Sequence, residues 1–136
     1  MPLRSLHDNG IGKDDIVAIQ LPNIVELVIS YFAILKVGAI SSPIPIQFRE
    51  FECLQLLQSL HAKAVITMQQ INDRQYAAMY AQLQPQVPSL QTIFTFDGHS
   101  VDSVTIDFED QIIKELPIVD FTANDIFTIC WTSGTE

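Results

Sequence analysis

The residues best suited to chemistry lie together at the end of the chain. They are Thr132, Ser133, Gly134, Thr135 and Glu136. Gly134 allows a left-handed backbone and a close approach to a ligand, and hydroxyls with successive backbone N–H groups can surround an anion. An ordinary polar turn uses the same residue types, and short motifs often match by chance. These residues alone therefore leave two interpretations, an anion-binding loop and a turn.

A strand is expected to lead into this loop. Residues 126–131 read Ile-Phe-Thr-Ile-Cys-Trp, which is rich in β-branched and aromatic types and predicts a buried strand. A buried strand followed by small hydroxyl residues is a common arrangement for holding a phosphate. The hypothesis is therefore that this chain is part of an enzyme and is cut where the nucleotide site of that enzyme begins.

Composition limits the functions that this chain can have. It has 136 residues, 48% of them hydrophobic and only 17% charged, which suits one domain or a part of a larger one that buries surface against neighbours. The net charge of −9 argues against nucleic acid and against anionic membrane surfaces as partners. The first residues have no apolar region of the kind that a secretory signal contains, so the predicted compartment is the cytoplasm.

Other chemically capable side chains are interpreted structurally. Cys53 and Cys130 lack metal-site spacing and are predicted to be small core residues. Trp131 suits a ligand site or packing in the sheet, and packing is the favoured interpretation. No metal-binding or catalytic role is expected of the histidines, which have no partner at ligand spacing: His7, His61 and His99. Surface charge is the expected role of the acidic residues that no pattern places in a cleft: Asp14, Asp15, Asp73, Glu109 and Asp110.

Strands and helices alternate along the chain. Strands are predicted at residues 16–21, 39–44, 63–68, 91–96 and 126–131. Helices are predicted at residues 3–9, 24–37, 48–60, 72–83 and 107–116, and residues 100–105 are ambiguous. The alternation predicts an α/β fold with a mostly parallel sheet flanked by helices and joined by right-handed crossovers.

Two of these helices carry specific expectations. The helix at 24–37 is apolar almost all round and should be buried, with Tyr31 and Phe32 in the core and Asn23 as its N-cap. It is shorter than the roughly 20 apolar residues that span a bilayer. The helix at 72–83 is expected to begin with a capping pair, Asn72 and Gln75.

Four blocks in the correct order resemble the AMP-forming acyl-CoA synthetases, members of the adenylate-forming superfamily. Residues 10–23, Gly-Ile-Gly-Lys-Asp-Asp-Ile-Val-Ala-Ile-Gln-Leu-Pro-Asn, are similar to G-(V/I)-x-x-G-D-x-V-A-I-x-L-P-N, with Asp14 in place of the usual Gly. Residues 32–45 are similar to x-L-A-x-x-K-x-G-A-x-x-x-P-x-x-P. Residues 59–66 resemble S-x-A-K-x-(V/L)-I with one inserted residue. Residues 131–135 resemble the start of the signature loop (Y/W)-T-S-G-T-(T/E)-G-x-P-K-G, in which Glu136 replaces the commoner second Thr.

The resemblance implies a function and a set of ligands. The chain would be a partial N-terminal AMP-binding domain, residues 1–136, truncated at both ends. The parent enzyme would activate a carboxylic acid with ATP as an acyl-adenylate and transfer the acyl group to CoA, with Mg²⁺ as cofactor. Residues 132–136 would bind the ATP phosphates. The catalytic Lys would lie downstream, so no catalytic residue is expected here and the chain alone should be inactive.

Alternatives remain at this point. An amino-acid adenylation module shares these blocks, and a stand-alone, non-enzymatic α/β binding domain is a different class of function. In either case neither a nucleic-acid partner nor a transmembrane segment is expected. If neighbouring parts are missing, apolar surface exposed by truncation should favour self-association.

Overall fold

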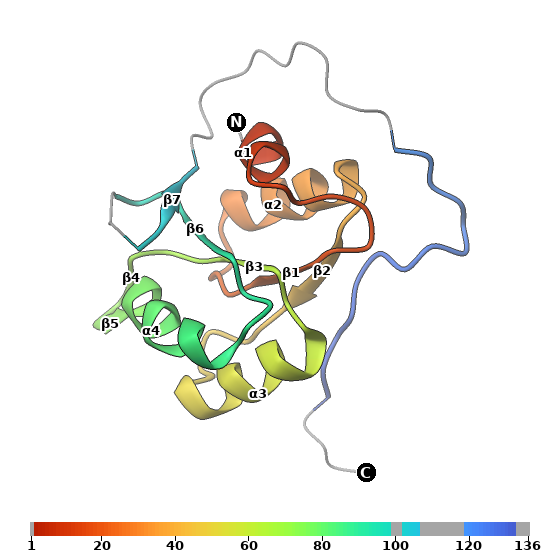
Figure 1. The fold of residues 1–136 in the computed structure, drawn as a ribbon. Helices are drawn as coiled ribbons and strands as arrows, with labels where there is room; N and C mark the ends of the chain where they lie inside the picture. Colours follow the sequence, from red (N-terminus) through yellow and green to blue (C-terminus); the bar gives the residue numbers. More distant parts are fainter. Residues whose placement is uncertain (1, 99–101, 107–118, 133–136) are drawn as a thin grey trace.

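The computed structural model describes residues 2–98, 102–106 and 119–132 (Figure 1). The helices are α1 (Pro2–Asp8), α2 (Val25–Lys36), α3 (Glu50–Leu60) and α4 (Tyr76–Leu83), which continues into a 3₁₀ turn, η1 (Gln84–Gln86). The strands are β1 (Ile16–Ile19), β2 (Ile40–Pro43), β3 (Ala64–Ile66), β4 (Gln70–Ile71), β5 (Arg74–Gln75), β6 (Thr92–Thr95) and β7 (Val104–Thr105).

Five of these strands form one sheet in the order β2-β1-β3-β6-β7. Every neighbouring pair in it is parallel. In the register, Val17 of β1 lies between Ser41 of β2 and Ala64 of β3. The prediction of a mostly parallel α/β sheet is confirmed. The residues that were ambiguous, 100–105, include β7 at one edge, whereas the helix predicted at 107–116 lies outside the described residues.

Helices cover both faces of the sheet. Figure 1 shows α1 and α2 on one side and α3 and α4 on the other. Alternate residues of β3 accordingly enter different cores: Val65 packs with α3 and α4, whereas Ala64 and Ile66 pack with α1 and α2. This burial on both faces explains why the inner strands read as continuous apolar runs.

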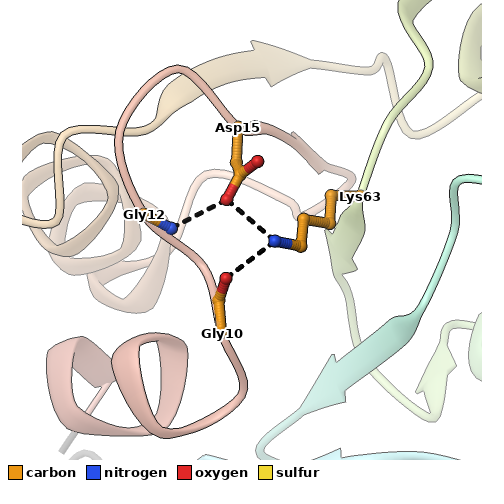
Figure 2. Close-up of polar contacts among 4 residues, drawn as sticks. All are labelled: Gly10, Gly12, Asp15 and Lys63. Carbon is orange, nitrogen blue, oxygen red and sulfur yellow. Dashed lines mark hydrogen bonds and ion pairs between the residues drawn. The ribbon is translucent and has the colours of Figure 1, made fainter.

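An ionic contact holds the turn before β1 to the start of β3. The Asp15 carboxylate accepts a hydrogen bond from the Gly12 N–H at 2.9 Å and contacts Lys63 Nζ at 3.1 Å, and Lys63 also donates to the Gly10 carbonyl at 2.8 Å (Figure 2). Only 28% of the Asp15 side chain is exposed. The interpretation of Asp15 as solvated surface charge was therefore wrong, because its carboxylate accepts hydrogen bonds from a backbone N–H and an ammonium group and so holds the turn in place.

The neighbouring Asp14 adopts a left-handed backbone with φ of 65°. The motif that this stretch resembles has Gly at that position, and glycine adopts this conformation without a Cβ penalty. We expect Asp14→Gly to raise the free energy of unfolding by up to about 1 kcal/mol, because the relief of strain exceeds the added entropy of the unfolded chain. Asp14→Ala should lower it. Urea unfolding of both variants checks this, and a shift of both midpoints in the same direction would contradict it.

Helix α2 is buried on one face only. Ser30, Ala33 and Ile34 face the sheet, and the Ser30 hydroxyl bonds to the Glu26 carbonyl at 2.6 Å. The opposite face is apolar and exposed: Val25 70%, Val28 53%, Ile29 36% and Phe32 60%. The expectation of burial all round, and of Phe32 in the core, was wrong. The N-cap is Ile24 and not Asn23.

Helix α4 starts later than expected. Residues 70–75 form an antiparallel hairpin of β4 and β5, and Asn72 lies at its tip with φ of 52°. Asparagine tolerates this left-handed conformation better than most residues do, so it serves the turn and not the helix cap. The predicted capping pair of Asn72 and Gln75 was therefore wrong. Among the helices of the described ranges, none is long and apolar enough to cross a membrane.

Candidate functional site

The segment before the hydroxyl-rich residues lies along the free edge of β2. The Ser41 N–H donates to the Phe127 carbonyl at 3.0 Å, and the Ile129 N–H donates to the Ser41 carbonyl at 2.9 Å. These bonds form a single parallel bridge between Ser41 and Thr128. The prediction of a buried strand at 126–131 was wrong: one bridge forms there, and Ile126 is 62% exposed. An edge segment has a neighbouring strand on one side only, so the backbone groups on its other side point away from the sheet.

Hydroxyl groups of β2 add to this attachment. Ser42 donates to the Ile129 carbonyl at 2.8 Å and accepts a hydrogen bond from the Trp131 indole N–H at 3.0 Å. Ser41 donates to the Phe127 carbonyl at 3.3 Å, and the Thr128 hydroxyl donates to the Ser41 carbonyl at 3.0 Å. Both serines are fully buried. These buried hydroxyls therefore find their hydrogen-bond partners in the terminal segment and attach it to β2.

The predicted phosphate-binding residues follow this attachment directly. Thr132 is exposed and comes immediately after Trp131. The other four, Ser133, Gly134, Thr135 and Glu136, lie outside the described residues. Because the segment runs parallel to β2, Thr132 follows it toward the carboxyl end of the sheet. Ligands of open parallel sheets bind beyond this end of the strands.

A cavity of about 540 Å³ lies at the same end of β1 and β2. Its lining includes Ile19, Leu21, Tyr31, Pro43, Cys130 and Trp131. Burial, with a further contribution from Cys130, raises the pKa of the Tyr31 hydroxyl. Trp131 is 38% exposed at the cavity wall, and Cys130 is exposed. The interpretations of Trp131 as packed in the sheet and of Cys130 as a core residue were therefore wrong, whereas Cys53 is buried as predicted.

One wall of the cavity is the loop at residues 45–48, whose backbone carbonyls accept hydrogen bonds from two side chains outside the loop. Gln20 Nε2 donates to the carbonyls of Pro45 at 2.8 Å and Phe48 at 3.2 Å. Arg74 donates to the carbonyls of Ile46 and Phe48, both at 3.2 Å. Sequence reasoning did not single out Gln20 or Arg74. A glutamine at the end of an apolar strand was the available signal, because a buried amide requires partners.

Gln20 also joins a buried polar cluster in the core. Its Oε1 atom accepts a hydrogen bond from the Tyr80 hydroxyl at 2.6 Å and lies 3.8 Å from Cys53 Sγ. Burial raises the pKa of Cys53, and it raises that of Tyr80 well above its usual value. Both groups therefore stay protonated at neutral pH, where they act as hydrogen-bond donors. A buried thiol of raised pKa is a poor nucleophile, so the cluster is structural.

Metal ligands do not gather in the part of the chain that the structure describes. Within residues 2–98, 102–106 and 119–132, no group of three or more His, Cys, Asp or Glu side chains is close enough to hold an ion. His7 Nδ1 lies 3.5 Å from Asp8 on α1, and both side chains are exposed.

Comparison with known proteins identifies relatives along nearly the whole chain. The family model described as "AMP-binding enzyme" matches residues 4–136. A medium/long-chain-fatty-acid–CoA/3-oxocholest-4-en-26-oate–CoA ligase of Mycobacterium marinum is 31% identical over 141 residues, covering 96% of this chain and 24% of that protein. The medium-chain fatty-acid–CoA ligase of Escherichia coli is 28% identical over 130 residues, covering 93% and 23%. The chain thus spans about a quarter of the length of these relatives.

Solved structures share the same arrangement of elements. The anthranilate CoA ligase AuaEII, in complex with anthranoyl-AMP, superposes with a TM-score of 0.80 at 21% identity, over 98% of this chain and 25% of that one. The acyl-CoA synthetase of Brucella canis gives a TM-score of 0.74 at 27% identity, over 98% and 24%. The likeness to the anthranilate CoA ligase, at 21% identity, establishes the fold alone.

Proposed function

The chain belongs to the AMP-binding enzyme family, and from this membership we propose that the protein containing it is an AMP-forming acid–CoA ligase. In the proposed reaction, a carboxylate oxygen attacks the α-phosphorus of ATP, forming an acyl-adenylate and releasing pyrophosphate. The CoA thiolate then attacks the acyl carbon, forms the thioester and releases AMP. The names of the relatives, which are CoA ligases of fatty and steroid acids, support this reaction over amino-acid adenylation.

Residues 132–136 are proposed to bind the β- and γ-phosphates of ATP. The observation that carries this assignment is the attachment of residues 127–131 to β2, which delivers Thr132 to the carboxyl end of a parallel sheet. Hydroxyl and backbone N–H donors suit phosphate oxygens there. A role for Mg²⁺ rests on the family resemblance, as does the role of Glu136.

Residues 1–136 are proposed to be part of the AMP-binding domain, and the isolated chain is proposed to be inactive. The motif resemblance places the acyl pocket, the adenine segment and the catalytic Lys in other parts of the enzyme. A cytoplasmic location is proposed with this function, and the free cysteines Cys53 and Cys130 are consistent with a reducing compartment. Self-association through the exposed face of α2 stays a prediction, to be tested by sedimentation.

The test of the proposed function uses the complete protein. With ATP, Mg²⁺, CoA and a panel of fatty acids, we expect equal amounts of AMP and pyrophosphate. Ser133→Ala and Thr135→Ala should each lower kcat/KM for ATP about 10- to 100-fold, because each removes a hydrogen bond to a charged group. Ser59→Ala changes an exposed hydroxyl on α3 and is the matched control, for which we expect full activity.

Two results would count against these assignments in different ways. Failure to form AMP with any carboxylic acid would reject the ligase function. Normal ATP kinetics in both hydroxyl variants would reject the phosphate-binding role of residues 132–136 while leaving the reaction in place.

A further inference from the structure

We propose that Ser42 is a positioning residue for the loop that begins at Thr132. Its hydroxyl fixes the indole of Trp131, and through it the point at which the chain enters the loop. The role of that loop in phosphate binding rests on the proposed function. The contact between Ser42 and Trp131 does not depend on it.

Ser42 is itself held in place by the sheet. It is fully buried in β2, where it pairs with Ala18 of β1. β1 lies between β2 and β3 in the sheet, and Ala18 is fully buried as well. The Ser42 hydroxyl therefore projects from a strand that the main sheet keeps in place.

The Ser42 hydroxyl makes two hydrogen bonds to the terminal segment. It donates its one proton to the Ile129 carbonyl at 2.8 Å and accepts the indole N–H of Trp131 at 3.0 Å. One side chain thus contacts both ends of residues 129–131. The next residue is Thr132, so these contacts fix the chain immediately before the proposed loop.

Trp131 has room to move once this bond is removed. Its side chain is 38% exposed, and it lines the cavity of about 540 Å³ at the ends of β1 and β2. A large indole beside open space can adopt other rotamers once its N–H partner is removed. Loss of the Ser42 hydroxyl would also release the Ile129 carbonyl, so the backbone that leads to Thr132 would lose an attachment to β2 as well.

The adjacent Ser41 provides a comparison within the same strand. Its hydroxyl bonds to the Phe127 carbonyl at a longer distance, 3.3 Å, and its backbone makes three further bonds to the segment. Ser41→Ala therefore removes one upstream hydroxyl contact and retains the backbone bridge. It is the matched control for Ser42→Ala.

A first experiment measures the contact directly in the 136-residue chain. Trp131 is its only tryptophan, so the emission reports one site. We expect Ser42→Ala to shift the emission to longer wavelength and at least to double acrylamide quenching, whereas Ser41→Ala changes both less. Ser42→Thr keeps the hydroxyl and should restore the original emission. Unchanged emission and quenching in Ser42→Ala, with circular dichroism like that of the original chain, would overturn the proposal.

A second experiment measures positioning through a double-mutant cycle in the complete protein. Trp131→Phe should raise KM for ATP about fivefold, the effect of losing one neutral hydrogen bond. Ser42→Ala also removes the bond to the Ile129 carbonyl and should raise KM for ATP at least as much. Both variants should change KM for the carboxylic acid less than twofold. The double variant should match Ser42→Ala, because both changes remove the same bond. Additive effects, or equal changes in both KM values, would overturn the positioning role. If the unsubstituted protein forms no AMP, the proposed function fails, and the emission experiment still decides the contact.

Discussion

Replacing Gly38 with alanine is expected to lower the free energy of unfolding by about 3 kcal/mol, through two separate costs. Gly38 has φ of 82°, a left-handed conformation that disfavours a Cβ by about 1–2 kcal/mol. The new Cβ would also lie 2.8 Å from a methyl group of Val119 and 3.2 Å from the Lys13 Cα. Crowding of this kind costs about 1–3 kcal/mol. Urea unfolding followed by circular dichroism measures the loss.

Two other glycines separate these costs. Gly10 also has a positive φ, 80°, but a Cβ there would have open space around it. Gly12 has open space and no positive φ. We therefore expect a loss of about 1–2 kcal/mol for Gly10→Ala from the backbone alone, and almost none for Gly12→Ala. A Gly38→Ala variant as stable as Gly12→Ala would contradict the structure around Gly38.

Replacing Gln20 with leucine should have a comparable effect, a loss of about 3 kcal/mol, for a different reason. The amide connects the Tyr80 hydroxyl in the core with the carbonyls of Pro45 and Phe48 in the loop. Leucine is similar in size but removes the amide's bonds to all three groups, at about 1 kcal/mol for each bond lost. Each group keeps one weaker or shared partner: Cys53 Sγ for the Tyr80 hydroxyl, the Phe48 N–H for the Pro45 carbonyl and Arg74 for the Phe48 carbonyl. Because the loop at residues 45–48 forms a wall of the cavity, we also expect this substitution to change the shape of the cavity. Urea unfolding measures the stability of this variant.

A cycle of variants distinguishes lost hydrogen bonds from disturbed packing. Tyr80→Phe removes the hydroxyl that Gln20 accepts, so the double variant Gln20→Leu with Tyr80→Phe should lose less than the sum of the single variants. Gln55→Leu on the exposed side of α3 is the matched control and should change the free energy by less than about 0.5 kcal/mol. Strict additivity would mean that the 2.6 Å bond between Tyr80 and Gln20 contributes nothing.

The parallel sheet was predictable from sequence because burial on both faces leaves a local mark. Residues 16–19 and 64–66 read as unbroken apolar runs, and each is followed by a helical pattern. Residues 126–131 are similarly rich in apolar types, but they lie at an edge of the sheet and their largest side chains are exposed. Composition reports the tendency of a segment to be buried. It does not report whether a neighbouring element is there to bury it.

Helix α2 shows the same limit. Its apolar residues outnumber the positions that contact the sheet, so Val25, Val28 and Phe32 face outward. Periodicity failed there because both faces are apolar, and no polar stripe marked the outer one. The prediction of a helix cap at Asn72 failed for another reason: the residue types that cap helices also occupy left-handed turns.

The candidate site was predictable only where it has a motif. The hydroxyl-rich residues at 132–135 were recognisable by type and order. Ser41 and Ser42 were not, because hydroxyls within an apolar strand look like neutral interruptions until the segment 86 to 89 residues later is placed beside them. Such pairings depend on the tertiary fold, and a single sequence contains no local pattern for them.

The bridge at Ser41 also covers part of the outer edge of β2. An edge strand with free N–H and C=O groups is a template on which another polypeptide can add in register, as in amyloid. Residues 127–129 occupy both backbone groups of Ser41 from within the same chain. The residues that lead to the proposed phosphate loop therefore keep these two groups of β2 from pairing with a second copy of the chain, and we expect detachment of the segment to favour aggregation through this strand.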